Sequence, residues 1–174
     1  MTILLLFLIL SIPLTAYSWP FLRRPPSHGF YRFFAFEACL ALILLNAPAW
    51  FTNPFTPLQL LSWLLLILSA ALAVHGVWLL LSLGRPTTGI ETTTQLVRQG
   101  AYRYIRHPLY ASLLFLGWGA FLKEISLWST ALVLVATVAL YATAKAEERE
   151  NLDKFGESYA AYIQETRMFI PYIF

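Results

Sequence analysis

Long apolar runs separated by short polar segments dominate the chain. They occupy residues 2–19, 30–50, 58–83, 109–122 and 125–144. A helix that crosses about 30 Å of hydrocarbon needs roughly 20 mostly apolar residues, and four of the runs come close to or exceed this length. The run at 109–122 would rise only about 21 Å as a helix. It must therefore extend backward into the preceding polar stretch, tilt little, or stop short of a full crossing.

The composition excludes a water-soluble globular domain. The 174 residues are 59% hydrophobic and only 12% charged, with a mean hydropathy of +0.64. An ordinary soluble domain carries about 25% charged residues, and the high apolar content also excludes disorder. The one cysteine, Cys39, rules out an internal disulfide and a cysteine-based zinc cluster. We predict an all-α integral membrane bundle that forms a single domain over residues 1–174.

The placement of basic residues predicts the topology. With five spanning helices and the N-terminus outside, the cytoplasmic segments hold every lysine and arginine except Lys123. This agrees with the positive-inside rule and predicts an N-out, C-in bundle with three spans in residues 1–83. The net charge of +3 is explained by this asymmetry, and no nucleic-acid partner is predicted. A signal peptide is the alternative for residues 2–19, but the run lacks a preceding basic segment and a convincing cleavage site.

The tail has a different pattern from the spans. Its apolar residues recur at helical spacing, and they are Leu152, Phe155, Tyr159 and Tyr162. Charged residues occupy the other positions around the helix. This predicts an amphipathic helix over residues 146–166 that lies on the membrane surface or on the bundle. Gly156 interrupts the pattern.

The densest group of polar and aromatic residues is the segment 100–110. Its arginines could simply contact anionic lipid headgroups. However, Pro108 after His107 is well placed to begin a helix. The free N–H groups of that helix start, beside Arg106, could bind a carboxylate or phosphate. The tyrosines of the segment could stack on a heterocycle such as adenine, for which a headgroup patch has no need.

Acidic residues and one histidine are further candidates for contact with a ligand. Glu147 and Glu148 could stabilise a helix dipole, or they could hydrogen-bond a ribose diol or an ammonium group. Glu37 and His75 lie inside apolar runs, where polar groups are costly and often functional. Glu37 could instead pair with Arg32, and His75 could donate to a neighbouring helix. The three histidines have no spaced partners, so no metal site is predicted.

A spaced motif runs through the second half of the chain. It reads Leu96-Val97-x-x-Gly100-x-Tyr102-x-x-x-Arg106-His107-Pro108-x-Tyr110, then Glu147-Glu148, Phe155-Gly156-x-x-Tyr159-x-x-Tyr162 and Ile170-Pro171. This pattern resembles the isoprenylcysteine carboxyl methyltransferase family, which is related to the membrane phospholipid methyltransferases. The resemblance covers residues 83–174, and the five spans are more similar to the compact prokaryotic members.

The resemblance implies a function and a set of site residues. Residues 84–174 would form a cofactor-binding loop, two short spans and the amphipathic helix, and the acceptor would arrive from the bilayer. The implied contacts of S-adenosylmethionine are Gln95, Leu96, Val97, Gly100, Tyr102, Arg106, His107, Pro108, Leu109, Tyr110 and Glu147. The catalytic residue stays open, with Glu37, His75 and Glu148 as candidates if the acceptor needs a base. The implied location is a bacterial or archaeal inner membrane rather than the endoplasmic reticulum.

The acceptor and two other functions stay open at the level of sequence. The acceptor would be lipophilic, either a prenylcysteine-like carboxylate or a lipid amine. Thr143 stands where the eukaryotic enzymes carry a substrate-contacting arginine, which counts against the prenylcysteine carboxylate. Membrane sterol reductases resemble this family in their C-terminal region, and Arg98 and Arg103 could bind the 2′-phosphate of NADPH. A non-enzymatic lipid-binding or scaffold protein is the third possibility.

Overall fold

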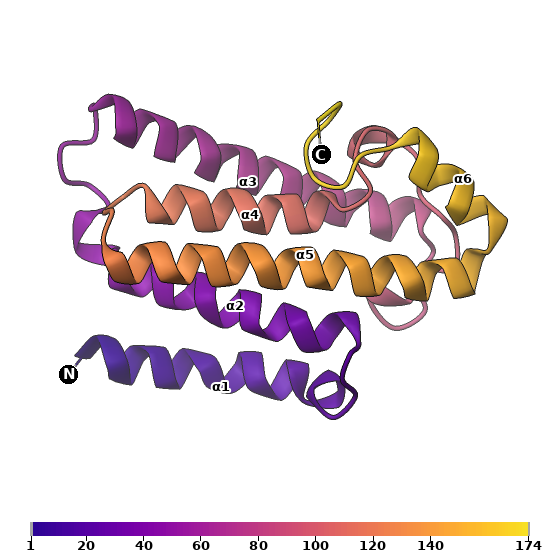
Figure 1. Cartoon of the computed structure of the whole chain (residues 1–174), viewed down its shortest axis with the longest axis horizontal. Coiled ribbons are helices and arrows are strands. Elements are labelled where there is room, and N and C mark those ends of the chain that lie inside the picture. The colour runs from indigo at the N-terminus through magenta and orange to yellow at the C-terminus, as the bar shows by residue number, and fades with distance from the viewer. Residues whose placement is uncertain (1, 174) are drawn as a thin grey trace.

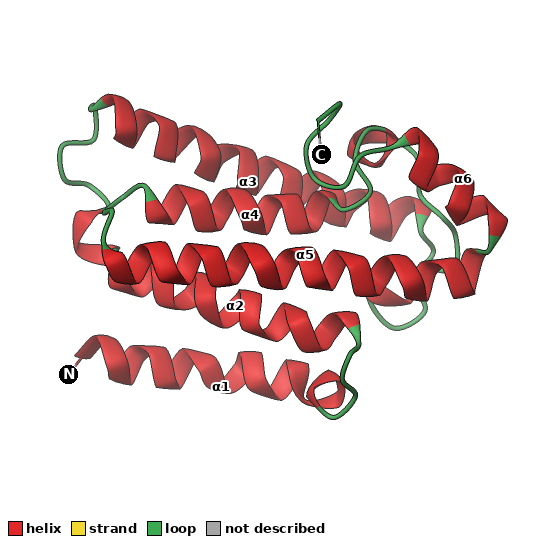
Figure 2. Ribbon diagram, in the orientation of Figure 1, coloured by secondary structure: helices red, strands yellow, loops and turns green. Residues whose placement is uncertain are grey.

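The computed structural model describes residues 2–173, and helices connected by loops make up this whole range (Figure 2). The helices are α1 (Thr2–Leu22), α2 (His28–Leu45), α3 (Pro57–Leu83), α4 (Pro108–Phe121), α5 (Leu127–Phe155) and α6 (Glu157–Glu165). Short 3₁₀ turns occur at Ala47–Ala49 (η1), Ile90–Thr92 (η2) and Gly100–Arg103 (η3). No strand forms between residues 2 and 173, so the prediction of an all-α protein is confirmed.

Four helices are long and apolar enough to cross a membrane, judged by length and composition. They are α1, α2, α3 and α5, whereas α4 has only 14 residues. Helices α1 to α5 run side by side, with α1 at one edge against α2 (Figure 1). The loop of residues 84–107, α6 and the C-terminal segment gather at one end of the bundle, called the loop end below.

The short helix α4 is held in the bundle by side chains at its C-terminal end. The last carbonyls of a helix have no partner within the helix and must be satisfied from outside. Asn46 donates to the carbonyl of Ala120 at 2.8 Å, and Ser62 donates to that of Gly119 at 2.7 Å. These buried bonds fix α4 against α2 and α3, and its N-terminus therefore has a defined position at the loop end.

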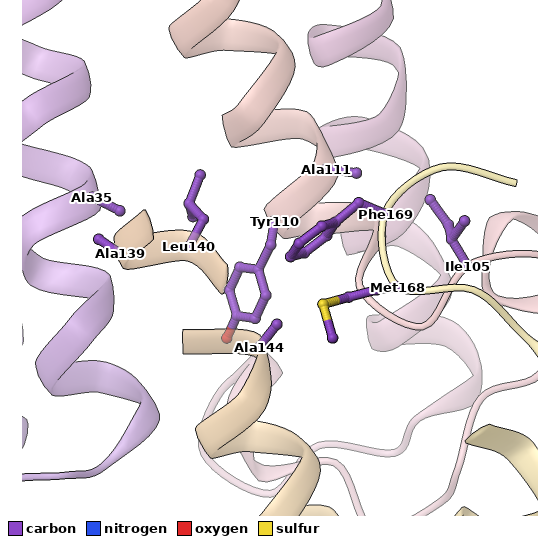
Figure 3. Close-up of a cluster of buried hydrophobic side chains, with 9 residues drawn as sticks. All are labelled: Ala35, Ile105, Tyr110, Ala111, Ala139, Leu140, Ala144, Met168 and Phe169. Atoms are coloured by element: carbon purple, nitrogen blue, oxygen red, sulfur yellow. The ribbon is translucent and has the colours of Figure 1, made fainter. Parts of the chain in front are cut away.

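Small side chains allow the helices to approach closely near the loop end. One buried cluster joins α2, α4, α5 and the C-terminal segment, and Figure 3 shows its members: Ala35, Ile105, Tyr110, Ala111, Ala139, Leu140, Ala144, Met168 and Phe169. Alanines at helix interfaces let backbones pack tightly in membranes. Because Met168 and Phe169 belong to this cluster, the C-terminal segment is part of the core at the start of α4.

The tail differs from the single helix predicted over residues 146–166. The spanning helix α5 continues to Phe155, and α6 begins only at Glu157. Gly156 separates the two helices with a φ of +55°, a conformation that glycine adopts without steric cost. Tyr159 and Tyr162 of α6 are both buried, so their apolar face packs on the bundle.

Candidate functional site

A cavity of about 240 Å³ lies at the loop end. Small-molecule sites are usually larger, roughly 300–1,000 Å³, so a ligand of nucleoside size would have to displace some of the lining side chains. Helices α2 to α6 and the loop of residues 84–107 contribute to the wall. Its charged and aromatic members are His28, Arg32, Glu91, Tyr102, Arg106, His107, Tyr110, Glu147, Glu150, Lys154, Phe155, Tyr159 and Tyr162.

The Arg106-His107 segment is positioned by the C-terminal segment. The N–H of Arg106 donates to the carbonyl of Arg167 at 2.8 Å, and that of His107 donates to Met168 at 3.2 Å. Pro108 then begins α4, as predicted, and His107 before it has a non-helical backbone with φ −125° and ψ 63°. The two side chains are thereby directed toward α5, where the acidic pair lies.

Arg106 and Glu148 form a buried ion pair. The Nε of Arg106 donates to Oε1 of Glu148 at 2.7 Å, and its Nη1 donates to the carbonyl of Thr166 at 2.6 Å. The other carboxylate oxygen of Glu148 accepts from Lys145 at 2.9 Å. Glu148 is not among the residues that line the cavity. This pair therefore connects the loop just before α4 to α5 and to the C-terminal segment.

His107 lies between the two glutamates. Its Nδ1 is 3.5 Å from Glu147, its Nε2 is 3.6 Å from Glu148, and its ring stacks on Tyr110. Burial lowers the pKa of His107, but the adjacent carboxylates of Glu147 and Glu148 outweigh burial and raise the pKa above its usual value. The Nε2 atom is buried without a hydrogen-bond partner. The imidazole is thus held between the two carboxylates, with Nε2 facing Glu148 beyond hydrogen-bond distance.

The loop residue Glu91 ties the N-terminal helices to the cavity. It accepts hydrogen bonds from Tyr17 of α1 and from Nη1 of Arg32 of α2, the latter at 2.5 Å. His28 lies 3.8 Å from Glu91 and also donates its backbone N–H to Glu150 of α5 at 3.0 Å. Burial would raise the pKa of Glu91, but hydrogen bonds from His28, Tyr17 and Arg32 lower it to about 2. Glu91 is therefore ionised at neutral pH.

The tyrosines at the loop end keep their protons at neutral pH. Burial raises the pKa of Tyr102, Tyr159 and Tyr162. Tyr162 donates its hydroxyl to the carbonyl of Tyr102 at 2.6 Å, which fixes α6 to the loop. Its ring also lies 5.4 Å from the guanidinium of Arg98. These neutral rings form the aromatic part of the cavity wall.

Most of the residues that the sequence nominated for the cofactor site lie around this cavity. Those that line it are Gln95, Leu96, Val97, Tyr102, Arg106, His107, Leu109, Tyr110 and Glu147. Pro108 is buried at the start of α4, and Gly100 lies against His75. Both support the wall from behind.

The three candidates for a catalytic base lie outside the lining. Glu37 accepts from the hydroxyl of Ser11 at 2.6 Å between α1 and α2, and Arg32 pairs with Glu91 instead of Glu37. His75 stacks on Trp78 and accepts a long hydrogen bond from the backbone of Ala101. Between residues 2 and 173, no group of three His, Cys, Asp or Glu side chains could hold a metal ion.

Five charged residues of the wall were not singled out from the sequence for this site. They are His28, Arg32, Glu91, Glu150 and Lys154. His28 entered only as one of three histidines without a metal-binding pattern, and Arg32 only through the charge asymmetry and as a partner for Glu37. The usable signal was Arg32 itself, because a charged residue within an apolar run is costly and needs a partner.

Gly100 offers a test of how the loop is supported. Its φ is +58°, and an added Cβ would lie 2.6 Å from His75 and 2.8 Å from Leu79. We expect Gly100→Ala to lower the free energy of unfolding by about 1–3 kcal/mol, through backbone strain and the clash. Gly156→Ala, with positive φ but open space, should cost about 1 kcal/mol. Gly89→Ala, extended and open, should leave stability unchanged in detergent unfolding experiments.

Comparison with known proteins places this geometry in a family. Residues 58–158 match the family described as phospholipid methyltransferase. The chain belongs to the phospholipid methyltransferase family. The resemblance found in the sequence is thereby confirmed, and the matched residues run from α3 into α6 and include most of the cavity wall.

A relative in this family aligns over part of the chain. Methanethiol S-methyltransferase 1 of Bradyrhizobium diazoefficiens is 30% identical over 71 residues, which are 41% of this chain and 24% of that protein. The chain thus matches less than two thirds of this relative's length. Helices α1 and α2 precede the region matched by the phospholipid methyltransferase family.

Proposed function

We propose that this chain is a membrane-embedded methyltransferase that transfers a methyl group from S-adenosylmethionine to a lipophilic acceptor entering from the bilayer. The observation that carries the proposal is the cavity, which brings Arg106, His107, Tyr110 and Glu147 together within the region matched by the family. Both the family description and the relative's name specify methyl transfer. The acceptor is a carboxylate or an amine of a lipid-like molecule.

The residues of the cavity fit the chemical groups of the proposed donor. Glu147 and Glu150 would hold an ammonium group or ribose hydroxyls through charge-assisted hydrogen bonds. The rings of Tyr102 and Tyr159 would pack against adenine. His107 lines the cavity and lies 3.5 Å from Glu147, so it would orient that carboxylate toward the ligand. S-adenosylmethionine would supply an electrophilic methyl group on sulfur.

The chain's own contribution to the reaction is to align the acceptor and to exclude water. Holding two reactants in line lowers the barrier without a nucleophilic side chain, and a dry site protects the reactive groups. A carboxylate acceptor needs no base, because it is already deprotonated. An amine acceptor would give its proton to one of the carboxylates that line the cavity, Glu147 or Glu150.

The topology that we propose has five spans, with the N-terminus outside and the C-terminus inside. The short α4 would be the fourth of these spans along the chain, enclosed by α2, α3 and α5. All lysines and arginines except Lys123 belong to segments near the loop end, which would face the cytoplasm. Residues 1–83 and 84–174 would form one domain, in a bacterial or archaeal inner membrane. The bacterial relative supports this location.

Ligand binding to the purified protein tests the proposal. Titration calorimetry in detergent should give heat with S-adenosylmethionine and S-adenosylhomocysteine, because the cavity offers partners for both. NADPH should give none. The absence of heat with both donor ligands up to millimolar concentration would contradict a methyltransferase, and heat with NADPH alone would favour a reductase. Incubation of lipid extracts with a radiolabelled methyl donor would then identify the acceptor.

A further inference from the structure

Arg32 has two donors that the folded protein does not use. Its side chain lines the cavity and is only 6% exposed. Nη1 donates to Glu91 at 2.5 Å, but Nε and Nη2 are buried without a hydrogen-bond partner. Buried polar groups are nearly always hydrogen-bonded, and an unpaired charged donor is costly. The unused donors therefore point to a ligand.

Aromatic rings fix the guanidinium group without satisfying these donors. The rings of Tyr17, Phe21 and Phe36 lie 5.3, 5.3 and 5.5 Å from its central carbon. Such rings attract the cation through their faces, and the Tyr17 hydroxyl donates to Glu91, so Nε and Nη2 still have no hydrogen-bond partner. The side chain is thus held in one place by three rings and by Glu91, with two donors left over.

We propose that Arg32 binds the carboxylate of a ligand in this cavity through Nε and Nη2. These two nitrogens share one edge of the guanidinium, where their N–H bonds run parallel and match the two oxygens of a carboxylate. The inference rests on the proposed function, in which two molecules could bring a carboxylate: the amino-acid end of the methyl donor, or the acceptor. Arg32 is then a specificity-determining residue that selects anionic ligands.

A role in anchoring the loop through Glu91 does not explain why residue 32 is an arginine. The bond to Glu91 uses Nη1 alone, and lysine could replace that contact. Lysine has no parallel pair of donors, so Arg32→Lys separates the two roles. Arg24→Lys is the matched control, because Arg24 is exposed in the connection between α1 and α2.

Paired probes test the assignment in protein reconstituted into lipid nanodiscs. S-adenosylhomocysteine carries a carboxylate, whereas 5′-methylthioadenosine is its counterpart without the amino-acid group; palmitate and hexadecanol form the second pair. We expect Arg32→Lys to weaken binding of one carboxylate probe about tenfold, the loss of a charge-assisted hydrogen bond. Its neutral counterpart should bind as before, and Arg24→Lys should bind all four probes like the wild type.

The outcomes distinguish the source of the carboxylate. A selective loss for S-adenosylhomocysteine assigns Arg32 to the methyl donor, and one for palmitate assigns it to the acceptor. A wild type that binds no nucleoside would contradict the proposed function, while a selective palmitate loss would still support Arg32. The assignment is wrong if the wild type prefers neither carboxylate probe, or if Arg32→Lys keeps that preference. Should Arg32→Lys not fold, Arg32→Gln, which retains a donor for Glu91, is measured in the same way.

Discussion

Glu148→Ala is expected to lower the free energy of unfolding by about 3–5 kcal/mol, because it leaves the guanidinium of Arg106 buried without its carboxylate. Arg106 and Glu148 are both less than 10% exposed and lie 2.7 Å apart. The same guanidinium binds the carbonyl of Thr166, so the loss extends to the C-terminal segment. Equilibrium unfolding in mixed detergent micelles, followed by tryptophan fluorescence, measures the change.

Two further variants show whether the buried pair is responsible. Lys145 is 46% exposed, so solvent screens the charge that it brings to Glu148. Lys145→Ala should therefore change stability by less than about 1 kcal/mol. Combining Glu148→Ala with Arg106→Met removes the stranded charge and should recover part of the loss. A Glu148→Ala variant as stable as the wild type would show that the pair does not anchor the loop end.

The helices could be predicted because their signal is local. Apolar runs of spanning length need only composition and length to be recognised, and the runs at 58–83 and 109–122 fall within one residue of α3 and α4. The end of α5 could not be placed in this way. The charged stretch after residue 145 looks like a new element, but the spanning helix continues to Phe155 until Gly156 turns the chain.

The site was only partly predictable, because some residues of the cavity wall belong to a sequence motif and others are brought there only by packing. Arg106, His107 and Glu147 belong to a spaced motif, which can be found along one stretch of sequence. His28, Arg32 and Glu91 are single charged residues from α2 and the loop, and only packing brings them together. Their contacts span 59 or more residues of sequence, and no spacing rule connects them.

The two groups of wall residues suit different parts of the proposed ligands. The family match begins at residue 58, so His28 and Arg32 come from α2, which lies outside it. Within the match, the carboxylates of Glu147 and Glu150 and the rings of Tyr102 and Tyr110 would suit the proposed nucleoside donor. The cationic Arg32 lies among rings of α1 and α2. If the acceptor enters from the bilayer as proposed, a carboxylate on it would meet this cationic part of the wall.

Glu147→Gln is expected to weaken S-adenosylhomocysteine binding tenfold to about a hundredfold, because it removes a carboxylate that would accept charge-assisted hydrogen bonds from the ligand. Glutamine has nearly the same shape, so packing at the start of α4 should persist. The substitution also removes one of the two carboxylates near His107, at 3.5 Å from Nδ1. Titration calorimetry in detergent gives the affinity, and thermal unfolding shows that the variant is folded.

Glu157→Gln is the matched control for this variant. Glu157 is exposed at the start of α6 and does not line the cavity, so the same loss of charge should leave the affinity unchanged. If the two variants weaken binding equally, the effect arises from net charge at the loop end and not from a contact in the cavity. A folded Glu147→Gln protein with wild-type affinity would remove Glu147 from the donor site. The Arg106-His107 turn would then have to bind the donor without the α5 carboxylate that faces it.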